Sequence, residues 1–376
     1  MKTLTYSLPS SLSFDNCDVV DKDINEQLNK DNYEAVVIDA AQTRYISSAG
    51  LRVLLGVKRR YDNLSVINTS TEVYDILEMT GFTKIINVEK SFPSVSIEGC
   101  PLLGKGAHGA VYRLAPDTIV KVYYDKNVTL DDIKNERELS KKAFVLGLPT
   151  AIALQIVKVG EDYGTIFELL NATSCSKYIN ESQENTDDFI NKAVAILKRM
   201  HKTPVKDGSL PDMKQLAFGY LNKVKTLLDN DTYLQVLKLL NNIPDTNTLI
   251  HGDFHLKNQL MVGSDLMLID MDTLCIGHPI FEFSQICNAY YEFSFLDPES
   301  VVNFLSIPLE KARYLWKEIS RRYCDDMNEE QYEVFANKAR AIGCMRALHF
   351  YNKRHYPEET INACLKDLKE ALSKIA

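Results

Sequence analysis

The chain has 376 residues, of which 45% are hydrophobic and 25% charged, a balance typical of a globular protein with a large core and not of a disordered one. Because roughly 150 residues make one domain, this length predicts more than one folding unit. The formal net charge of -8 excludes a broadly basic surface, so we expect no nucleic-acid partner.

Signals for export or membrane insertion are missing from the sequence. The N-terminus has no apolar stretch long enough for the core of a signal peptide, and no run of about 18 apolar residues occurs anywhere. We therefore expect a cytoplasmic protein with no membrane partner. The eight cysteines are scattered singly, without a CxxC pair or a metal-ligand spacing with histidine, and are expected to be reduced thiols.

Strands and helices are predicted to alternate in the first 90 residues. AVVIDA at 35–40 reads as a buried strand, and the amphipathic stretch at 47–62 as a helix. A second strand at 64–68 precedes another amphipathic helix, for which Gly81 supplies the C-terminal stop, and a last strand is expected at 84–88. This order predicts a compact α/β unit.

The string YISSAGLRVLL, between AVVIDA and LEMTGFTKII, resembles the STAS family, whose bacterial members include anti-sigma-factor antagonists. In those antagonists the serine just before the glycine is phosphorylated by a partner kinase, and here that position is Ala49. Ser47 and Ser48 lie at the same helix start, where a phosphate is favoured but where a serine also serves as an N-cap. The resemblance implies a domain at 1–92 that docks a protein partner or senses a signal.

A second domain is expected at 97–376, and Pro93 and Gly99 punctuate the boundary stretch in which it begins. Near its start, LGKGAHGAVY has the GxGxxG spacing, which suits close approach of the backbone to phosphate. A dinucleotide-binding fold would place a helix next, whereas here VYRL turns at APD into the strand TIVKVYY, which favours a kinase hairpin. The glycines predicted to bind nucleotide are Gly104, Gly106 and Gly109.

Three further residues are predicted to bind the nucleotide. Lys121 lies inside the second hairpin strand, from which its ammonium reaches the α- and β-phosphates of ATP. Its acidic partner is expected on the next helix, where Glu136 and Glu138 are the candidates. YGTIFELL ends a strand at Glu168, where the order of elements places the connection between the lobes of a kinase and the adenine.

The segment LIHGDFHLKNQLMV carries the strongest signal in the chain. Its HGDxHxxN spacing lets one loop supply a carboxylate, Asp253, that accepts the proton of an attacking hydroxyl, and an amide oxygen, from Asn258, that binds magnesium. LMLIDMDT then ends an apolar strand at Asp270, the predicted metal carboxylate, with Asp272 as the weaker candidate. Together with ATP, Asn258 and Asp270 suffice for Mg²⁺.

At these residues the chain resembles the aminoglycoside and choline kinase-like phosphotransferases, over about residues 98–350. The resemblance implies a bilobal, protein-kinase-like α+β fold with a helical C-lobe. It also implies that Asp253 is the catalytic base and that Asn258 and Asp270 bind magnesium. The helix position in the related phosphotransferases favours Glu136 as the partner of Lys121, with Glu138 as a competitor. In GHPIFEFSQ the family usually has an aspartate that braces the catalytic loop, and this chain has Glu282.

These features lead us to expect an ATP- and Mg²⁺-dependent kinase that phosphorylates a hydroxyl group of a small molecule. Helices at roughly 186–240 and 290–375 are expected to form the acceptor pocket. Two alternatives remain: a kinase acting on a protein serine, and a nucleotide-sensing module whose output is the STAS-like surface. The complete set of catalytic residues argues against the second alternative, and the sequence does not choose the acceptor.

Overall fold

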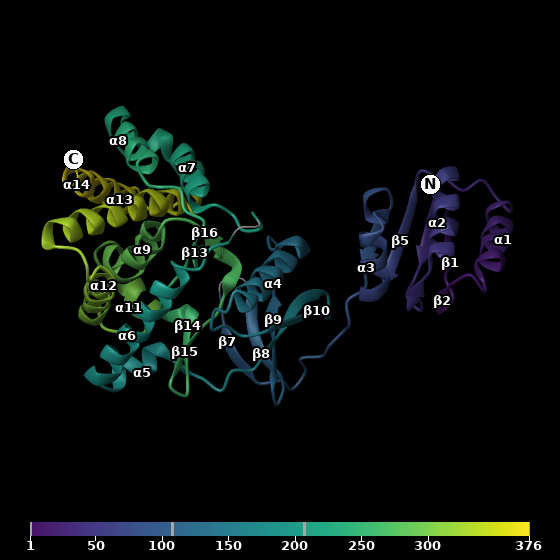
Figure 1. Ribbon diagram of the computed structural model, residues 1–376, viewed down its shortest axis with the longest axis horizontal. Helices are drawn as coiled ribbons and strands as arrows, with labels where there is room; N and C mark the ends of the chain where they lie inside the picture. Colours follow the sequence, from purple (N-terminus) through teal and green to yellow (C-terminus); the bar gives the residue numbers. More distant parts are fainter. Residues whose placement is uncertain (1, 107–108, 206–207, 376) are drawn as a thin grey trace. The chain divides into compact units, whose positions relative to one another are not determined.

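The computed structural model describes residues 2–106, 109–205 and 208–375 (Figure 1). They divide into two compact units, 1–98 with 156–164, and 99–155 with 165–376. Each unit has its own hydrophobic core. Of the helices in the described ranges, none combines the length and the apolar character that a membrane span needs.

The first unit is built on a parallel sheet with the strand order β1-β3-β5-β6. Because parallel neighbours cannot be joined by a tight turn, helices connect them, as predicted for an α/β unit. A second, short parallel pair is formed by β2 and β4. The elements are β1 (Thr3–Ser7), β2 (Ser11–Leu12), α1 (Cys17–Leu28), β3 (Ala35–Asp39), β4 (Tyr45–Ile46), α2 (Ser48–Arg60), β5 (Leu64–Thr69), α3 (Thr71–Met79), η1 (Phe82–Lys84) and β6 (Asn87–Lys90).

The last strand of this unit begins later than the sequence predicts. Gly81, at φ 79°, leads into the 3-10 turn η1, so the expected strand at 84–88 becomes β6 three residues further on. The segment after β6 is also paired, since Lys158 N–H donates to the Pro93 carbonyl at 2.8 Å and accepts at its own carbonyl from Val95 N–H at 2.9 Å. This stretch, which reads as an unstructured boundary in the sequence, is therefore held by hydrogen bonds.

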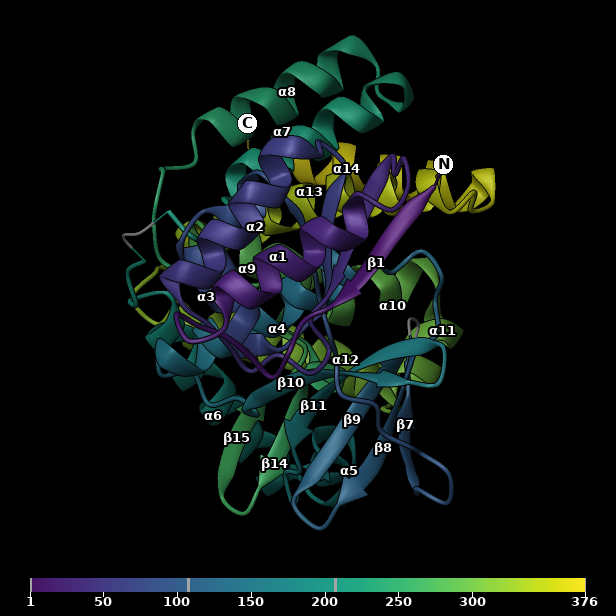
Figure 2. The ribbon, with the colours of Figure 1, turned by 90° about the vertical axis from the view of Figure 1, so that its right-hand side faces the viewer.

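The second unit begins with a sheet whose strand order is β10-β11-β9-β8-β7 (Figure 2). Strands β7, β8 and β9 pair antiparallel, which is the predicted hairpin arrangement around the glycine loop. Helix α4 follows β9 and starts at a capping box between Thr129 and Asp132. The bounds are β7 (Leu102–Lys105), β8 (Gly109–Ala115), β9 (Thr118–Tyr123), α4 (Leu130–Val145), β10 (Ala153–Val159) and β11 (Asp162–Glu168).

The remainder of the second unit is mainly helical. Short strands interrupt the helices, with the antiparallel order β12-β14-β15 in one sheet and β13 paired with β16 in another. The bounds are β12 (Thr173–Ser174), α5 (Cys175–Glu181), α6 (Gln183–Met200), α7 (Met213–Val224), η2 (Lys225–Leu227), α8 (Asn230–Asn241), β13 (Leu249–Ile250), η3 (Leu256–Asn258), β14 (Gln259–Val262), β15 (Asp265–Leu268), η4 (Met271–Thr273), β16 (Cys275–Ile276), α9 (Pro279–Cys287), η5 (Asn288–Glu292), α10 (Phe293–Leu296), α11 (Pro298–Leu305), α12 (Leu309–Tyr323), α13 (Glu329–Lys353) and α14 (Glu358–Ser373).

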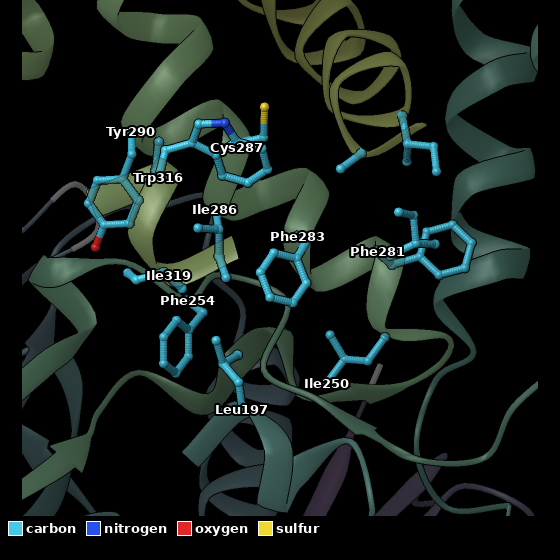
Figure 3. Packing of buried hydrophobic residues seen from close by; sticks show 14 of the residues in the cluster. Leu197, Ile250, Phe254, Phe281, Phe283, Ile286, Cys287, Tyr290, Trp316 and Ile319 are labelled. Carbon is cyan, nitrogen blue, oxygen red and sulfur yellow. The ribbon is translucent and has the colours of Figure 1, made fainter. Parts of the chain in front are cut away.

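The core of the helical region lies directly beneath the HGDxHxxN segment. Phe254 of that segment is buried among side chains that include Leu197 of α6, Phe283 of α9 and Ile319 of α12 (Figure 3). Close packing of this kind restricts the backbone on either side of the buried ring. The core therefore fixes the segment that carries the predicted catalytic groups.

Candidate active site

The glycine loop joins β7 to β8, and its turn is closed by a 2.9 Å hydrogen bond from Gly106 N–H to the Gly109 carbonyl. A Cβ atom on Gly109 would lie 1.9 Å from the Val122 carbonyl oxygen, so β8 can pack on β9 only with glycine there. At Gly104 and Gly106 a Cβ would meet no atom within 4 Å. These two glycines leave open space into which a phosphate could approach. Residues 107 and 108 of the predicted loop lie outside the described residues.

Lys121 extends from β9 toward two carboxylates. Its Nζ lies 2.7 Å from Glu136 Oε1 and 2.9 Å from Asp270 Oδ1. Glu136, on α4, is 8% exposed, whereas Glu138 of the same helix pairs with Arg137 and Lys141 at the surface. Burial opposes the charge of Lys121, but the two carboxylates outweigh it and raise the lysine pKa well above its usual value. Lys121 therefore remains a cation held in one position.

Asp253 and Asn258 are bonded to each other across the catalytic loop. The Asn258 Nδ2 amide group donates to Asp253 Oδ2 at 2.9 Å and to the Asp253 carbonyl at 3.0 Å. Its Oδ1 oxygen has no hydrogen-bond partner within the described ranges. Burial favours protonation of Asp253, but the hydrogen bond from His255 and the charges of His255, His251 and Arg346 prevail and lower the Asp253 pKa to about 2. Asp253 is thus a carboxylate that can accept a proton or orient a donor.

Asp270 follows β15 in a left-handed backbone conformation, with φ 63° and ψ 69°. This conformation is unfavourable for a residue other than glycine, and such strain is concentrated at functional sites. A 2.9 Å hydrogen bond from Ile269 N–H to the Asn258 carbonyl ties this segment to the catalytic loop. Burial and the carboxylates of Asp270 and Glu136 raise the pKa of Asp272.

The oxygen donors at this place suit Mg²⁺. Asn258 Oδ1 is an amide oxygen to which no described residue donates a hydrogen bond, and Asp270 adds a carboxylate. No group of three or more His, Cys, Asp or Glu side chains that could hold a metal occurs in the described part of the chain. Mg²⁺ usually binds through one or two protein oxygens together with substrate phosphates and water, so this sparse donor set fits a magnesium–nucleotide complex.

Glu282 of α9 braces the catalytic loop from below. Its side chain is 0% exposed, and its two carboxylate oxygens accept the backbone N–H groups of His251, at 2.6 Å, and Gly252, at 3.0 Å. The longer side chain thus still reaches the loop. Behind it lies His201, whose Nε2 is 4.0 Å from Glu282 Oε2 and whose Nδ1 is 2.8 Å from Tyr323 Oη. His201 is buried.

Three more contacts hold the loop, and no sequence motif predicts them. Tyr290 Oη accepts Leu256 N–H at 2.8 Å, and Arg346 Nη1 donates to the Gly252 carbonyl at 3.1 Å. Thr273 Oγ1 donates to the His251 carbonyl at 2.8 Å. These partners lie on η5, α13 and η4, so their common position depends on the tertiary fold and leaves no local pattern.

Glu168 ends β11, as expected, and its side chain turns back toward the chain before β10. Its Oε1 accepts Ile152 N–H at 3.0 Å, and its own N–H donates to the Ile152 carbonyl at 3.1 Å. Two residues later, Leu170 N–H makes no hydrogen bond to any described residue. If adenine binds here, it therefore meets backbone groups and not the Glu168 carboxylate.

The hairpin with its lysine, the braced loop and the strained aspartate together define a kinase-like phosphotransferase. The chain matches the phosphotransferase enzyme family over residues 99–303 and the STAS domain over residues 2–96. The first match covers more than half of the chain, and the protein belongs to that family. It is thus a phosphotransferase with an alcohol group as acceptor.

Among solved structures, the chain is similar to a GDP complex of an aminoglycoside 2'-phosphotransferase-IIIa mutant, with a TM-score of 0.50, 14% identity, and coverage of 80% of this chain and 96% of that one. It is also similar to ADP-bound aminoglycoside phosphotransferase APH(2'')-Ib, with a TM-score of 0.48, 16% identity, and coverage of 81% of this chain and 99% of that one. A choline/ethanolamine kinase family protein from Mesorhizobium loti is similar with a TM-score of 0.48, 12% identity, and coverage of 73% of this chain and 92% of that one. At such identity the first of these establishes a common fold only. No curated protein matched the chain.

Proposed function

We propose that this protein transfers the γ-phosphoryl group of ATP, in the presence of Mg²⁺, to a hydroxyl group of a small molecule. One observation carries the proposal. Lys121 bonds to Asp270, Asn258 bonds to Asp253, and the Ile269–Asn258 backbone bond links the two pairs. Groups suited to phosphate, metal and hydroxyl thus lie together although they come from distant parts of the sequence.

The nucleotide would be held by groups of this unit. Lys121, kept charged and fixed by Glu136, binds the α- and β-phosphates, beside the open space at Gly104 and Gly106. The backbone after Glu168 is available for the adenine. Asn258 and Asp270 would hold Mg²⁺, which neutralises phosphate charge when bound.

Asp253 orients the acceptor hydroxyl and takes its proton. As the acceptor oxygen bonds to the γ-phosphorus, the bond from that phosphorus to the β–γ bridging oxygen breaks, and ADP leaves. With a pKa of about 2, Asp253 is a weak base, so most of its effect comes from orienting the hydroxyl. His255, with Nε2 3.2 Å from Asp253 Oδ2, keeps the carboxylate in place.

A coupled assay of ADP release tests this function. The purified protein is given Mg-ATP and a panel of alcohols, including sugars, amino alcohols and hydroxy acids, and is compared with Asp253→Asn. We expect at least one alcohol to stimulate ADP release, dependent on Mg²⁺ and on Asp253. Release that no acceptor stimulates, or that Asp253→Asn leaves unchanged, contradicts the proposal.

For the first unit we propose a docking role for residues 1–92. Ala49 stands where antagonists of the STAS family carry their phosphorylated serine, and the Ser47 hydroxyl already serves as the N-cap of α2 by accepting Gly50 N–H at 3.3 Å. Incubation with ATP is therefore expected to leave Ser47 and Ser48 unmodified. Mass spectrometry checks this, and phosphate on either serine would argue for a switch instead.

A further inference from the structure

Arg346 has more hydrogen-bonding capacity than the fold uses. Its side chain, on α13, is 8% exposed and donates from Nη1 to the carbonyl of Gly252, the residue before Asp253. Its Nε is buried with no partner, and its Nη2 has no hydrogen bond to any residue in the described ranges. Because buried polar groups in native structures are normally hydrogen-bonded, a guanidinium so placed is suited to a ligand that supplies the missing acceptors.

The surroundings of Arg346 are aromatic and positively charged. Its guanidinium carbon lies 5.8 Å from the ring centre of Tyr220 on α7 and 5.7 Å from that of Phe350. His349 stacks on Tyr220, with 5.1 Å between ring centres. Helices α7 and α13 pack against each other (Figure 1), so these side chains form one surface.

Among the described residues no carboxylate forms a salt bridge with this surface, although the charge of Arg346 also acts on the nearby Asp253 carboxylate. Burial, and then the charges of Lys223, Lys353 and Arg346, lower the pKa of His349. In the part of the chain that the structure describes, none of these four residues forms an ion pair. Arg340 of the same helix differs sharply, since it pairs with three carboxylates, those of Glu292, Asp367 and Glu370. Arg340, in the middle of α13, is thus paired with carboxylates, whereas Arg346 beside the catalytic loop forms no ion pair with a described residue.

We propose that the acceptor carries an anionic group, a carboxylate or a phosphate, that binds to Arg346 beside the catalytic loop while its hydroxyl meets Asp253. This inference rests on the proposed function and narrows its substrate class. An anion would accept hydrogen bonds from the unused donors of Arg346 and balance the charges of Lys223 and Lys353. A cationic acceptor would meet three groups of its own sign, those of Arg346, Lys223 and Lys353, and a neutral one would leave them unbalanced.

The first test compares acceptors that differ mainly in charge. Glycerol, glycerate, glycerol 3-phosphate and ethanolamine, followed by neutral sugars against their phosphates and acids, are assayed for ADP release at one fixed Mg-ATP concentration. We expect kcat/KM to be at least about tenfold higher for the anionic member of the best pair. A neutral or cationic acceptor that outperforms its anionic counterpart overturns the inference.

The second test changes the protein. Lys223→Glu and Lys353→Glu alter exposed side chains that do not touch the catalytic loop, and each is expected to raise the KM for the anionic acceptor about fivefold or more and leave the KM for ATP unchanged. Lys366→Glu makes the same charge change on α14 and serves as the control, with no effect expected. Equal acceptor KM values in the Lys223, Lys353 and Lys366 variants would overturn the inference.

Arg346 itself is tested by two substitutions. Arg346→Gln should raise the acceptor KM by about a hundredfold, and Arg346→Lys should restore part of that loss because it restores the charge. Loss of kcat alone, with the acceptor KM unchanged, would mean that Arg346 only supports Gly252. Acceptor-dependent activity that prefers neutral compounds would contradict this inference but agree with the proposed function. The absence of acceptor-dependent ADP release with every compound would contradict both.

Discussion

The side chains of Asp253 and Asn258 are hydrogen-bonded to each other, but we expect Asp253 to act on the acceptor and Asn258 to bind Mg²⁺. Asp253 acts on the acceptor hydroxyl, so Asp253→Asn should leave Mg-ATP affinity nearly intact and lower kcat by at least about a hundredfold. The Asn258 amide retains a partner, because the new amide oxygen can accept where Oδ2 accepted. Calorimetric titration and ADP-release kinetics measure the two quantities, and equal losses in both would contradict the assignment.

Asp270 is expected to act on the nucleotide and not on the acceptor. Asp270→Ala removes the metal carboxylate and one of the two partners of Lys121, so Mg-dependent ATP binding should be lost. Alanine also tolerates the positive φ of this position no better than aspartate does, so the backbone change offers no compensation. Unchanged ATP affinity in the presence of Mg²⁺ would show that the metal binds elsewhere. Asp265→Ala, at the exposed start of β15, is the control.

At the scale of a single element, α4 offers a matched pair. Glu136→Gln removes the charge that holds Lys121, and should raise the KM for ATP about tenfold or more. Glu138→Gln makes the same chemical change on the exposed side of the helix, and should leave the KM for ATP within about twofold. Steady-state kinetics measure the KM for ATP of each variant, and thermal melting checks that the two variants are equally stable. Similar KM values would mean that α4 does not position the lysine.

Elements that carry their information locally could be predicted from the sequence. The β8–β9 hairpin follows from a glycine loop next to an alternating strand. The HGDxHxxN segment contains both Asp253 and Asn258, whose side chains are hydrogen-bonded to each other, within a few residues of sequence. The preference for Glu136 over Glu138 came from family resemblance, and its place on the buried side of α4 agrees with it.

Elements that depend on distant partners could not be predicted. Helix α13 is buried on most sides near Arg346, so no amphipathic pattern distinguishes that residue from the core. Tyr290 reaches the catalytic loop, and His201 approaches the Glu282 side chain that braces it, because the core brings η5 and the end of α6 beneath the loop. The shift of β6 has a local cause, the 3-10 turn after Gly81, which a glycine alone does not distinguish from a simple helix end.

For the whole molecule, the hydrogen bonds of Lys158 decide where the chain can be divided. The boundary between residues 92 and 97 remains a prediction, and Pro93 and Val95 within it are partners of Lys158. A fragment of residues 91–376 should be soluble and bind Mg-ATP, because the second unit has its own core. A fragment of residues 97–376 should bind ATP equally but melt at a lower temperature. Differential scanning calorimetry and ATP titration compare them, and failure of both to bind would contradict a self-sufficient second unit.

The distribution of cysteines should allow the unmodified sequence to be labelled at a single site. Every cysteine lies in the described ranges, and all but Cys100 are buried. Burial also raises the pKa of several of these thiols, to about 12 for Cys175 and Cys324, so the reactive thiolate is scarce there. A maleimide fluorophore should therefore attach at Cys100 alone, two residues before β7 and the glycine loop, as peptide mapping can verify. Without any engineered mutation, such a reporter would place a fluorophore beside the glycine loop, where a change in its emission would report nucleotide binding.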